Sequence, residues 1–265
     1  MTDQRKTIDI QIQKESGASG KSPLRQYQDL VVGSRSIWFL IKFELIGLLF
    51  SRIPGALGLA MRKIFYPMIL GEVGRGVVFG MDVWFRHPKK IRIGAGTIID
   101  DGALLDAKGS ANAGITLGKS CYIGRGSVLS CKEGDIVFGD FVNLSTWCNI
   151  SSNSSIAIGE KTLLGPYTSL FATAHNFDDP DTAVLDQGWT SQGITIGANC
   201  WLGARVSVLD GVNIGDATVV GTAAMVNSDL PARVVAIGAP AKAVKERKGK
   251  SSPPEGPIGD NQSVS

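Results

Sequence analysis

The most regular feature of the chain is an apolar residue at every sixth position through much of the region 72–242. Gly often follows this leading residue, and a small or β-branched residue usually stands four places after it. A period of six matches neither the α-helical period of about 3.6 nor the strand period of 2, so it predicts a short strand and a turn repeated many times. The leading positions are Val73, Phe79 and Phe85, then Ile93, Ile99, Leu105, Ala111, Leu117, Ile123 and Leu129, then Phe138, Leu144, Ile150 and Ile156, then Ile158, Leu164 and Leu170, and finally Ile196, Leu202, Val208, Ile214, Val220 and Val226.

Such a repeat predicts an all-β fold, a parallel β-helix over residues 72–242. Three hexapeptides would form one triangular coil, with the leading side chains filling a narrow prism. The residues four places on, such as Thr97, Cys121 and Cys148, would also point inward and must therefore be small. A β-sandwich is the alternative, but its strands recur irregularly at about 8–12 residues, unlike these long runs of constant spacing.

The remaining zones differ in composition. Residues 1–30 are polar and predicted to be flexible, and residues 243–265 form a polar, proline-bearing tail predicted to be disordered. Residues 31–71 form an apolar, helix-like segment interrupted at Pro54. Its 36–50 stretch carries eleven large apolar residues, too short a run to span a bilayer.

Two compatible interpretations of this apolar segment remain open. Its helices could cap the open end of the first coil. They could also lie in a membrane interface through residues 36–70, with Arg52, Arg62 and Lys63 near the lipid headgroups. We favour peripheral membrane contact, because a small cap does not require so many apolar side chains.

Charge and composition exclude several classes of protein. The net charge of +3, without a clustered basic stripe, argues against nucleic acid as a partner. The polar N-terminus lacks a secretory signal, which predicts a cytoplasmic protein, at the inner face of the membrane if the apolar segment binds there. Cys121, Cys131, Cys148 and Cys200 form no CxxC pair and are predicted to be reduced core residues.

Histidine is rare in this chain. A zinc site built on three histidines is excluded because the sequence has only His87 and His175, and we predict no metal. His87, in the FRHPKK turn, is predicted to be solvated. His175 lies in the largest interruption of the repeat, residues 171–193, and a loop that leaves a rigid prism is a natural place for chemistry.

Three motifs carry a resemblance to a known family. They are TAHNFD at 173–178, the block from ITIGANCWLG onward at 194–226, and IGAPAK at 237–242. With them, residues 72–245 resemble the hexapeptide-repeat acyltransferases, which include maltose, galactoside and polysaccharide O-acetyltransferases. The resemblance implies a left-handed β-helix, acetyl-CoA as cosubstrate, and a homotrimer with cofactor sites between subunits.

The resemblance also implies roles for individual residues. His175 matches the family's general base, and an imidazole ordinarily ionises near neutral pH, as that role requires. Asp178 matches an acidic residue that would orient His175 or hold the loop, although it could equally be a surface carboxylate. Where the family places an acceptor-binding Asn, this chain has Ser145, with Asn143 two residues away.

For coenzyme A, the family lays the pantetheine arm along the prism, mostly against backbone. Lys242 would reach a phosphate of the cofactor, and Trp201 has packing at a coil corner as its alternative role. Asp210 replaces a proline common in the family, with no functional consequence expected. The matching cofactor residues are Trp201, Gly203, Ala204, Gly221, Thr222 and Lys242.

The predicted function is therefore an acetyl-CoA-dependent O-acetyltransferase that acts on a sugar hydroxyl, in surface polysaccharide or lipid-linked glycan biosynthesis. One alternative keeps the chemistry but changes the acceptor to an amino sugar or a non-sugar alcohol. Another is a non-catalytic β-helix scaffold at the membrane, which would not bind acyl-CoA.

Overall fold

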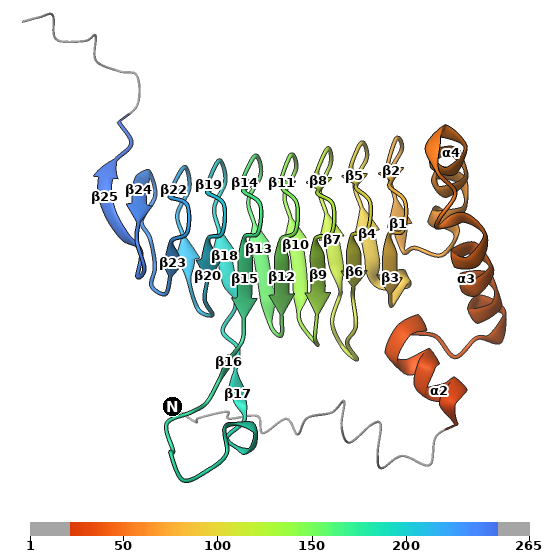
Figure 1. The fold of residues 1–265 in the computed structure, drawn as a ribbon, viewed down its shortest axis with the longest axis horizontal. Coiled ribbons are helices and arrows are strands. Elements are labelled where there is room, and N and C mark those ends of the chain that lie inside the picture. The colour runs from red at the N-terminus through yellow and green to blue at the C-terminus, as the bar shows by residue number, and fades with distance from the viewer. Residues whose placement is uncertain (1–21, 249–265) are drawn as a thin grey trace, which may run out of the picture.

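A computed structural model describes residues 22–248, in which parallel strands form a three-sided solenoid with helices at one end (Figure 1). Sheet A contains β1 (Glu72–Val73), β4 (Ile91–Ile93), β7 (Ile115–Leu117), β10 (Asp135–Phe138), β13 (Ser155–Ile158), β18 (Ile194–Ile196) and β21 (Asn213–Ile214). Sheet B contains β2 (Val78–Phe79), β5 (Ile98–Ile99), β8 (Tyr122–Ile123), β11 (Asn143–Leu144), β14 (Leu163–Leu164), β19 (Trp201–Leu202), β22 (Val219–Val220), β24 (Val234–Ile237) and β25 (Lys242–Glu246). Sheet C contains β3 (Trp84–Arg86), β6 (Leu104–Asp106), β9 (Val128–Cys131), β12 (Asn149–Ser152), β15 (Ser169–Ala172), β20 (Ser207–Val208) and β23 (Met225–Val226).

The chain visits sheets A, B and C in turn, and each strand pairs in parallel with the strand one coil later. Leading residues stack in register, so that Ile99 lies opposite Ile123, and Ile123 opposite Leu144. Only β25 runs antiparallel to its neighbour within these three sheets. The predicted left-handed parallel β-helix is confirmed.

The core of the prism is built as the repeat predicts. Leading residues such as Ile99 and Leu144 are completely buried, and so are small residues such as Thr97 four places after a leading position. The Thr97 hydroxyl donates to the Gly118 carbonyl (2.9 Å) and accepts from the Cys121 N–H (3.1 Å). A hydroxyl fits this narrow interior because both of its hydrogen-bonding roles are satisfied by backbone.

Ala111 is an exception, and its predicted place as a leading residue is wrong. Ala111 is exposed and lies between β6 and β7, in the segment 107–114, which forms no strand. Lys90 holds this loop, donating to the Gly109 carbonyl (2.7 Å) and the Asn112 Oδ1 (2.8 Å). Leu105, Ala111 and Leu117 keep the spacing of six, but the hexapeptide that contains Ala111 forms a loop and not a strand of the coil.

Glycine after a leading residue is required by close approach between coils. A Cβ on Gly118 would lie 2.5 Å from the Gly139 carbonyl carbon of the next coil, closer than real contacts allow. Left-handed backbone occurs elsewhere in the corners, often at larger residues such as Trp147 (φ 58°) and Tyr167 (φ 62°).

All four cysteines are buried and free, as predicted. Burial raises the pKa of the Cys131 thiol to about 12 and that of Cys148 to about 11. The Cys148 Sγ lies 3.2 Å from the Gly165 carbonyl of the next coil, in the same inward column as the small residues. Since the thiolate is the reactive form, these side chains act as packing groups.

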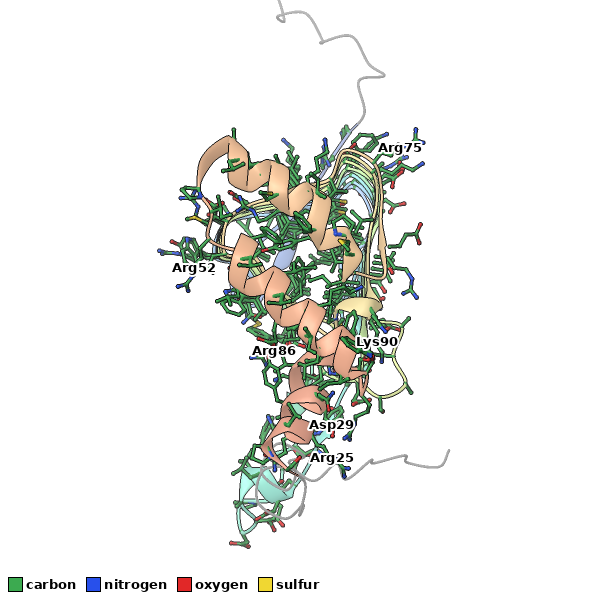
Figure 2. The ribbon with its side chains drawn as sticks, turned by 90° about the vertical axis from the view of Figure 1, so that its right-hand side faces the viewer. Arg25, Asp29, Arg52, Arg75, Arg86 and Lys90 are labelled. Atoms are coloured by element: carbon green, nitrogen blue, oxygen red, sulfur yellow. The ribbon has the colours of Figure 1, made fainter. Side chains whose placement is uncertain are left out.

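Helices cover the first coil: α2 (Pro23–Tyr27), η1 (Gln28–Val32), α3 (Ile37–Phe50), α4 (Gly55–Phe65) and η2 (Tyr66–Met68). Figure 2 shows them lying across the end of the prism. Ser36 caps α3 by accepting from the Phe39 N–H (3.3 Å), and Pro54 separates α3 from α4. The first helix begins at Pro23, inside the segment 1–30 that the sequence predicted to be flexible. β25 (Lys242–Glu246) extends into the segment 243–265 that was predicted to be a disordered tail. Residues 1–21 and 249–265 lie outside the described part.

Arg62 corrects the expectation that it lies near lipid headgroups. It is only 1% exposed. Its guanidinium donates to the carbonyls of Phe79 (3.0 Å), Ile53 (2.8 Å) and Phe50 (3.2 Å). These bonds join the end of α3, the turn before α4 and the first coil, so a buried cation fastens the cap.

His87 was predicted to be solvated, and this is wrong. It is 9% exposed and lies between η1 and the first coil. Its Nε2 is 2.8 Å from the Asp29 carbonyl, and its backbone N–H donates to Val31 (2.8 Å). Burial lowers the pKa of this imidazole.

Candidate active site

The candidate catalytic residue lies on a hairpin loop that leaves the prism after β15 and returns at β18 (Figure 1). The loop contains β16 (Ala174–His175), η4 (Val184–Asp186) and β17 (Trp189–Thr190). β16 and β17 pair antiparallel, with His175 opposite Trp189. The short sheet therefore fixes the backbone that carries His175.

Hydrogen bonds hold the outer part of this loop together. Asn176 bonds across the hairpin, through its N–H to the Gly188 carbonyl (3.1 Å) and its side-chain amide to the Gln187 carbonyl (2.9 Å). Gln187 donates in turn to the carbonyls of Asp179 (2.7 Å) and Thr182 (2.8 Å). The hydroxyl of Thr182 donates to Asp179 and helps to lower the pKa of that exposed carboxyl. The loop is thus ordered by its own polar side chains.

The base of the loop is tied to the prism at two points. Ser191 Oγ lies 2.5 Å from the Ala172 carbonyl and 2.8 Å from Ser154 Oγ. Asp210, at the corner after β20, accepts from the N–H groups of Gln192 and Gly193, each at 2.9 Å. Asp210 therefore holds the base of the loop, although no consequence was expected for this residue. The two residues that it contacts lie 17 and 18 positions away, so the local sequence does not indicate this role.

The side chains of His175 and Asp178 are both exposed. Within residues 22–248, neither forms a hydrogen bond or an ion pair, with the other or with any further residue. The structure of a single chain thus leaves both imidazole nitrogens open to a substrate or to a neighbouring molecule.

Most of the predicted cofactor residues gather along the later coils of sheet B and the corner between sheets B and C. Trp201 points outward from β19 and is 54% exposed. A Cβ on Gly203 would meet the Thr222 backbone N at 2.7 Å, which places these two residues side by side on successive coils. Ala204 lies beside Gly203 in this corner.

The last of these coils brings Gly221 and Lys242 toward each other. A Cβ on Gly221 would meet the Ile237 side chain at 2.8 Å, and Ile237 pairs with Lys242 between β24 and β25. The Lys242 side chain is exposed. This arrangement places the exposed Lys242 side chain at the last coil, beside the Ile237 side chain that covers Gly221.

The predicted acceptor residues lie on the same sheet, nearer to the helical cap. Asn143 is exposed on β11, two strands before β19 in sheet B. Ser145 begins the following corner, half-buried, and its carbonyl accepts from the Ser127 hydroxyl (2.9 Å). Asn143 therefore presents an amide to the outside, whereas Ser145 is partly enclosed by the coil before it.

These groups occupy different edges of the prism. The His175 loop leaves at the edge where sheet C gives way to sheet A, while Gly203 and Thr222 lie where sheet B gives way to sheet C. Figure 1 shows the loop extending away from the edge formed by sheet B. One chain therefore carries both halves of the predicted site without joining them. Among residues 22–248, no three His, Cys, Asp or Glu side chains are grouped as metal ligands.

Comparison with known proteins supplies the family. No protein-family model matches the sequence. The chain is 35% identical over 136 residues to Rv3034c of Mycobacterium tuberculosis, a protein named as an acetyltransferase, and the match covers 51% of this chain and 45% of that protein. It is 32% identical over 134 residues to WcaF of Escherichia coli, named as a colanic acid biosynthesis acetyltransferase, covering 51% of this chain and 70% of WcaF.

A solved structure agrees in fold. A mutant of AntD, an N-acyltransferase from Bacillus cereus crystallised with dTDP and coenzyme A, superposes with a TM-score of 0.50 at 21% identity, covering 76% of this chain and 93% of that one. The chain spans about half the length of Rv3034c but more than two thirds of WcaF. With its six-residue repeat and three-sided solenoid, the chain belongs to the hexapeptide-repeat acyltransferase family.

Proposed function

We propose that this protein transfers an acetyl group from acetyl-CoA to a hydroxyl of a sugar, with His175 as the general base. The observation that carries the proposal is the hairpin loop, which holds an exposed imidazole out from a rigid prism by hydrogen bonds at its base and its tip. WcaF is named for the biosynthesis of a polysaccharide, and this supports a glycan of the cell surface as the acceptor.

In the proposed reaction, the His175 imidazole removes the proton of the acceptor hydroxyl while its oxygen attacks the thioester carbonyl carbon. The tetrahedral intermediate then collapses, the carbon–sulfur bond breaks, and the thiolate of coenzyme A leaves and takes up the proton from the imidazolium. Products are the acetyl ester and free coenzyme A. No cysteine need act as a nucleophile, since all four are buried in the prism.

Acetyl-CoA would lie along the edge between sheets B and C. Its pantetheine arm would pass the corner that holds Gly203 and Gly221, Trp201 would contact it from β19, and Lys242 would pair with a phosphate. Because the His175 loop lies at another edge, we propose that a second subunit supplies it, in a homotrimer whose sites lie between chains. Asn143 would bind the acceptor, and Asp178 would orient the imidazole.

The test is thiol release from acetyl-CoA by the purified full chain, with a panel of sugars, oligosaccharides and amino sugars. His175→Ala should lower kcat by about 10²–10⁴-fold, the usual contribution of a general base, without changing the Kd of acetyl-CoA in calorimetry. Asp186→Ala is the matched control, because Asp186 is an exposed carboxylate of the same loop. Undiminished turnover in His175→Ala would refute the assignment of the base, and failure to bind acetyl-CoA would favour the scaffold alternative.

A further inference from the structure

The helical cap presents an apolar surface to solvent that neither the fold nor the proposed reaction uses. α3 is apolar on two faces. Phe39 and Ile46 are buried on its inner face, whereas Trp38 and Leu48 on its outer face are 79% and 81% exposed. A helix that is apolar all round is normally covered all round. The large apolar side chains exposed between residues 22 and 70 are Leu24, Tyr27, Ile37, Trp38, Ile41, Leu45, Leu48, Leu49, Leu57, Leu59, Ile64 and Met68.

This surface, which we term the cap face, carries an excess of positive charge. Residues 22–70 contain six Lys and Arg and only two Asp and Glu. Without the buried Arg62, five basic and two acidic residues remain, an excess of three positive charges. Both acidic residues are engaged, Asp29 with Arg35 (2.7 Å) and Glu44 with the Tyr27 hydroxyl (2.5 Å). Figure 2 shows Arg25, Arg52 and Arg75 around the edge of the helices.

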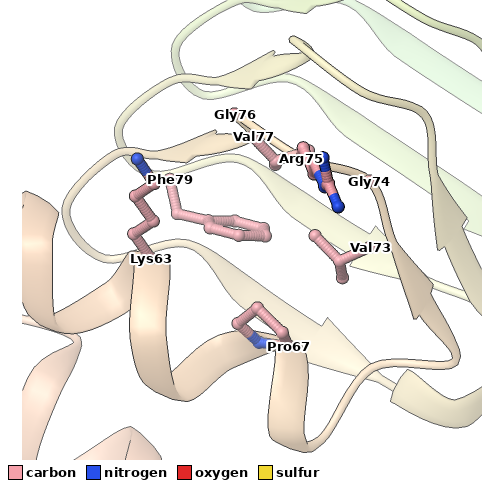
Figure 3. Close-up of a pocket in the computed structure, with 8 residues that line it drawn as sticks. All are labelled: Lys63, Pro67, Val73, Gly74, Arg75, Gly76, Val77 and Phe79. Atoms are coloured by element: carbon pink, nitrogen blue, oxygen red, sulfur yellow. The ribbon is translucent and has the colours of Figure 1, made fainter.

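Two cations stand beside a cavity at one side of the cap face. The cavity, of about 340 Å³, lies between η2 and the first coil, where Pro67 and Val73 form part of its wall. Lys63 and Arg75 lie on either side of the Phe79 ring in Figure 3. Neither forms an ion pair with another residue in 22–248. Two unpaired cations above apolar side chains fit a phosphate group joined to an apolar body.

We propose that the cap face docks on a lipid bilayer that contains anionic phospholipids. The outer side chains of α3 and α4 enter the interface, and Lys63 and Arg75 contact lipid phosphates. Trp38, which is 79% exposed on α3, is a residue type enriched at membrane–water interfaces. A 14-residue helix is about 21 Å long, shorter than a hydrocarbon core of about 30 Å, so α3 lies in the plane of the membrane. None of the helices described between residues 22 and 248 is long and apolar enough to cross a bilayer.

Charge favours the bilayer over a second copy of the chain. Two cap faces placed together would bring like charges into one interface, which opposes association. An anionic lipid surface instead attracts the same cations while accepting the apolar side chains.

The experiment is flotation of the full-length protein with vesicles of phosphatidylcholine alone, or of equal parts phosphatidylcholine and phosphatidylglycerol. We expect binding to the mixed vesicles that weakens with salt. Leu45→Ser with Leu48→Ser should weaken the binding constant by about tenfold or more, since both side chains lose their burial in the interface. Lys63→Gln with Arg75→Gln should weaken it several-fold and reduce its salt dependence.

The matched control is Val137→Ser with Phe141→Ser, which removes two exposed apolar side chains from the flank of the prism and should bind as the natural sequence does. Circular dichroism confirms that each variant is folded. Absence of binding to mixed vesicles at low salt, or equal binding by the leucine variant, would overturn the proposal. So would sedimentation showing that the cap face instead joins two copies. The assay needs no turnover, so its outcome is independent of acetyl transfer.

Discussion

Arg62 gives the sharpest test of how the cap is attached to the β-helix. Its three hydrogen bonds to carbonyls are each worth about 1.5–3 kcal/mol for a charged donor. Against this, burying a cation costs several kcal/mol. Replacing Arg62 with Met removes both contributions and leaves three carbonyls unpaired, two of them only partly buried and so partly rehydrated. We expect a net loss of about 2–4 kcal/mol.

This loss should be local, because each coil of a solenoid contacts only its neighbours. Hydrogen exchange followed by mass spectrometry should show protection of residues 37–65 falling by about 30- to 1000-fold, the equivalent of 2–4 kcal/mol. Peptides from β21 to β23 should exchange as before. Arg62→Lys should be intermediate, since an ammonium group lacks the fork that reaches three carbonyls.

Gly58→Ala offers an independent route to the same effect, because its Cβ would lie 1.7 Å from the Ile53 carbonyl oxygen that Arg62 binds. Unchanged protection in Arg62→Met, or an equal loss throughout the prism, would refute the reasoning.

Three further predictions concern the loop, the cap and the core. Asp210→Ala should raise hydrogen exchange at the Gln192 and Gly193 amides, which lose their acceptor. It should lower kcat by about 5- to 30-fold, the equivalent of about 1–2 kcal/mol, and leave the Kd of acetyl-CoA unchanged. Normal turnover together with faster exchange in the loop would show that loop order is not required. Burial lowers the pKa of His87, so as the pH falls this imidazole is protonated in the unfolded chain before it is protonated in the folded one. The free energy of unfolding should therefore keep its full value above about pH 6.5 and decrease as the pH falls through the folded pKa. Thermal melting at pH 7.5 and 5.5 should show this loss of stability, and the loss should be smaller in His87→Gln. The charged groups near the imidazole are Asp106, Lys90 and Lys108. The same pH dependence in both proteins would contradict the prediction. Thr97→Val should cost about 1–3 kcal/mol by leaving the Cys121 N–H and the Gly118 carbonyl without this partner, whereas Thr97→Ser, measured by denaturation, should cost less.

The β-helix could be predicted because its physical cause lies within each six-residue unit. A leading residue such as Ile99 and a small residue such as Thr97 report directly on the interior of a narrow prism. Ala111 shows the limit of this reasoning. An inserted loop of six residues preserves the spacing, so only the contacts of Lys90 with Gly109 and Asn112 distinguish loop from wall.

The features that sequence could not supply depend on contacts between distant segments. His87 and Arg62 look like solvated groups in their local context, yet each is buried by pairing with carbonyls of another element. Asp210 is bound to the base of the loop by the same kind of long-range contact. The position of His175 on a protruding loop could be predicted, but its placement at a different edge from Gly203 follows only from the order of the sheets.

The cap face and the loop together set a geometric condition on the acceptor, if both proposals above hold. β15, from which the loop leaves, is the fifth strand of sheet C counted from the cap, so about four coil spacings of 4.8 Å, or roughly 19 Å, separate it from the first coil. The capping helices add about 10 Å. A docked protein would thus hold His175 roughly 30 Å from the lipid, beyond the reach of one sugar attached to a lipid carrier. With lipid-linked acceptors in anionic vesicles, turnover should therefore rise with glycan length, while detergent-dispersed acceptors should show a weaker dependence. Equal rates for the shortest and longest lipid-linked acceptors on vesicles would contradict this orientation, because a prism standing on its cap cannot lower its loop to the membrane surface.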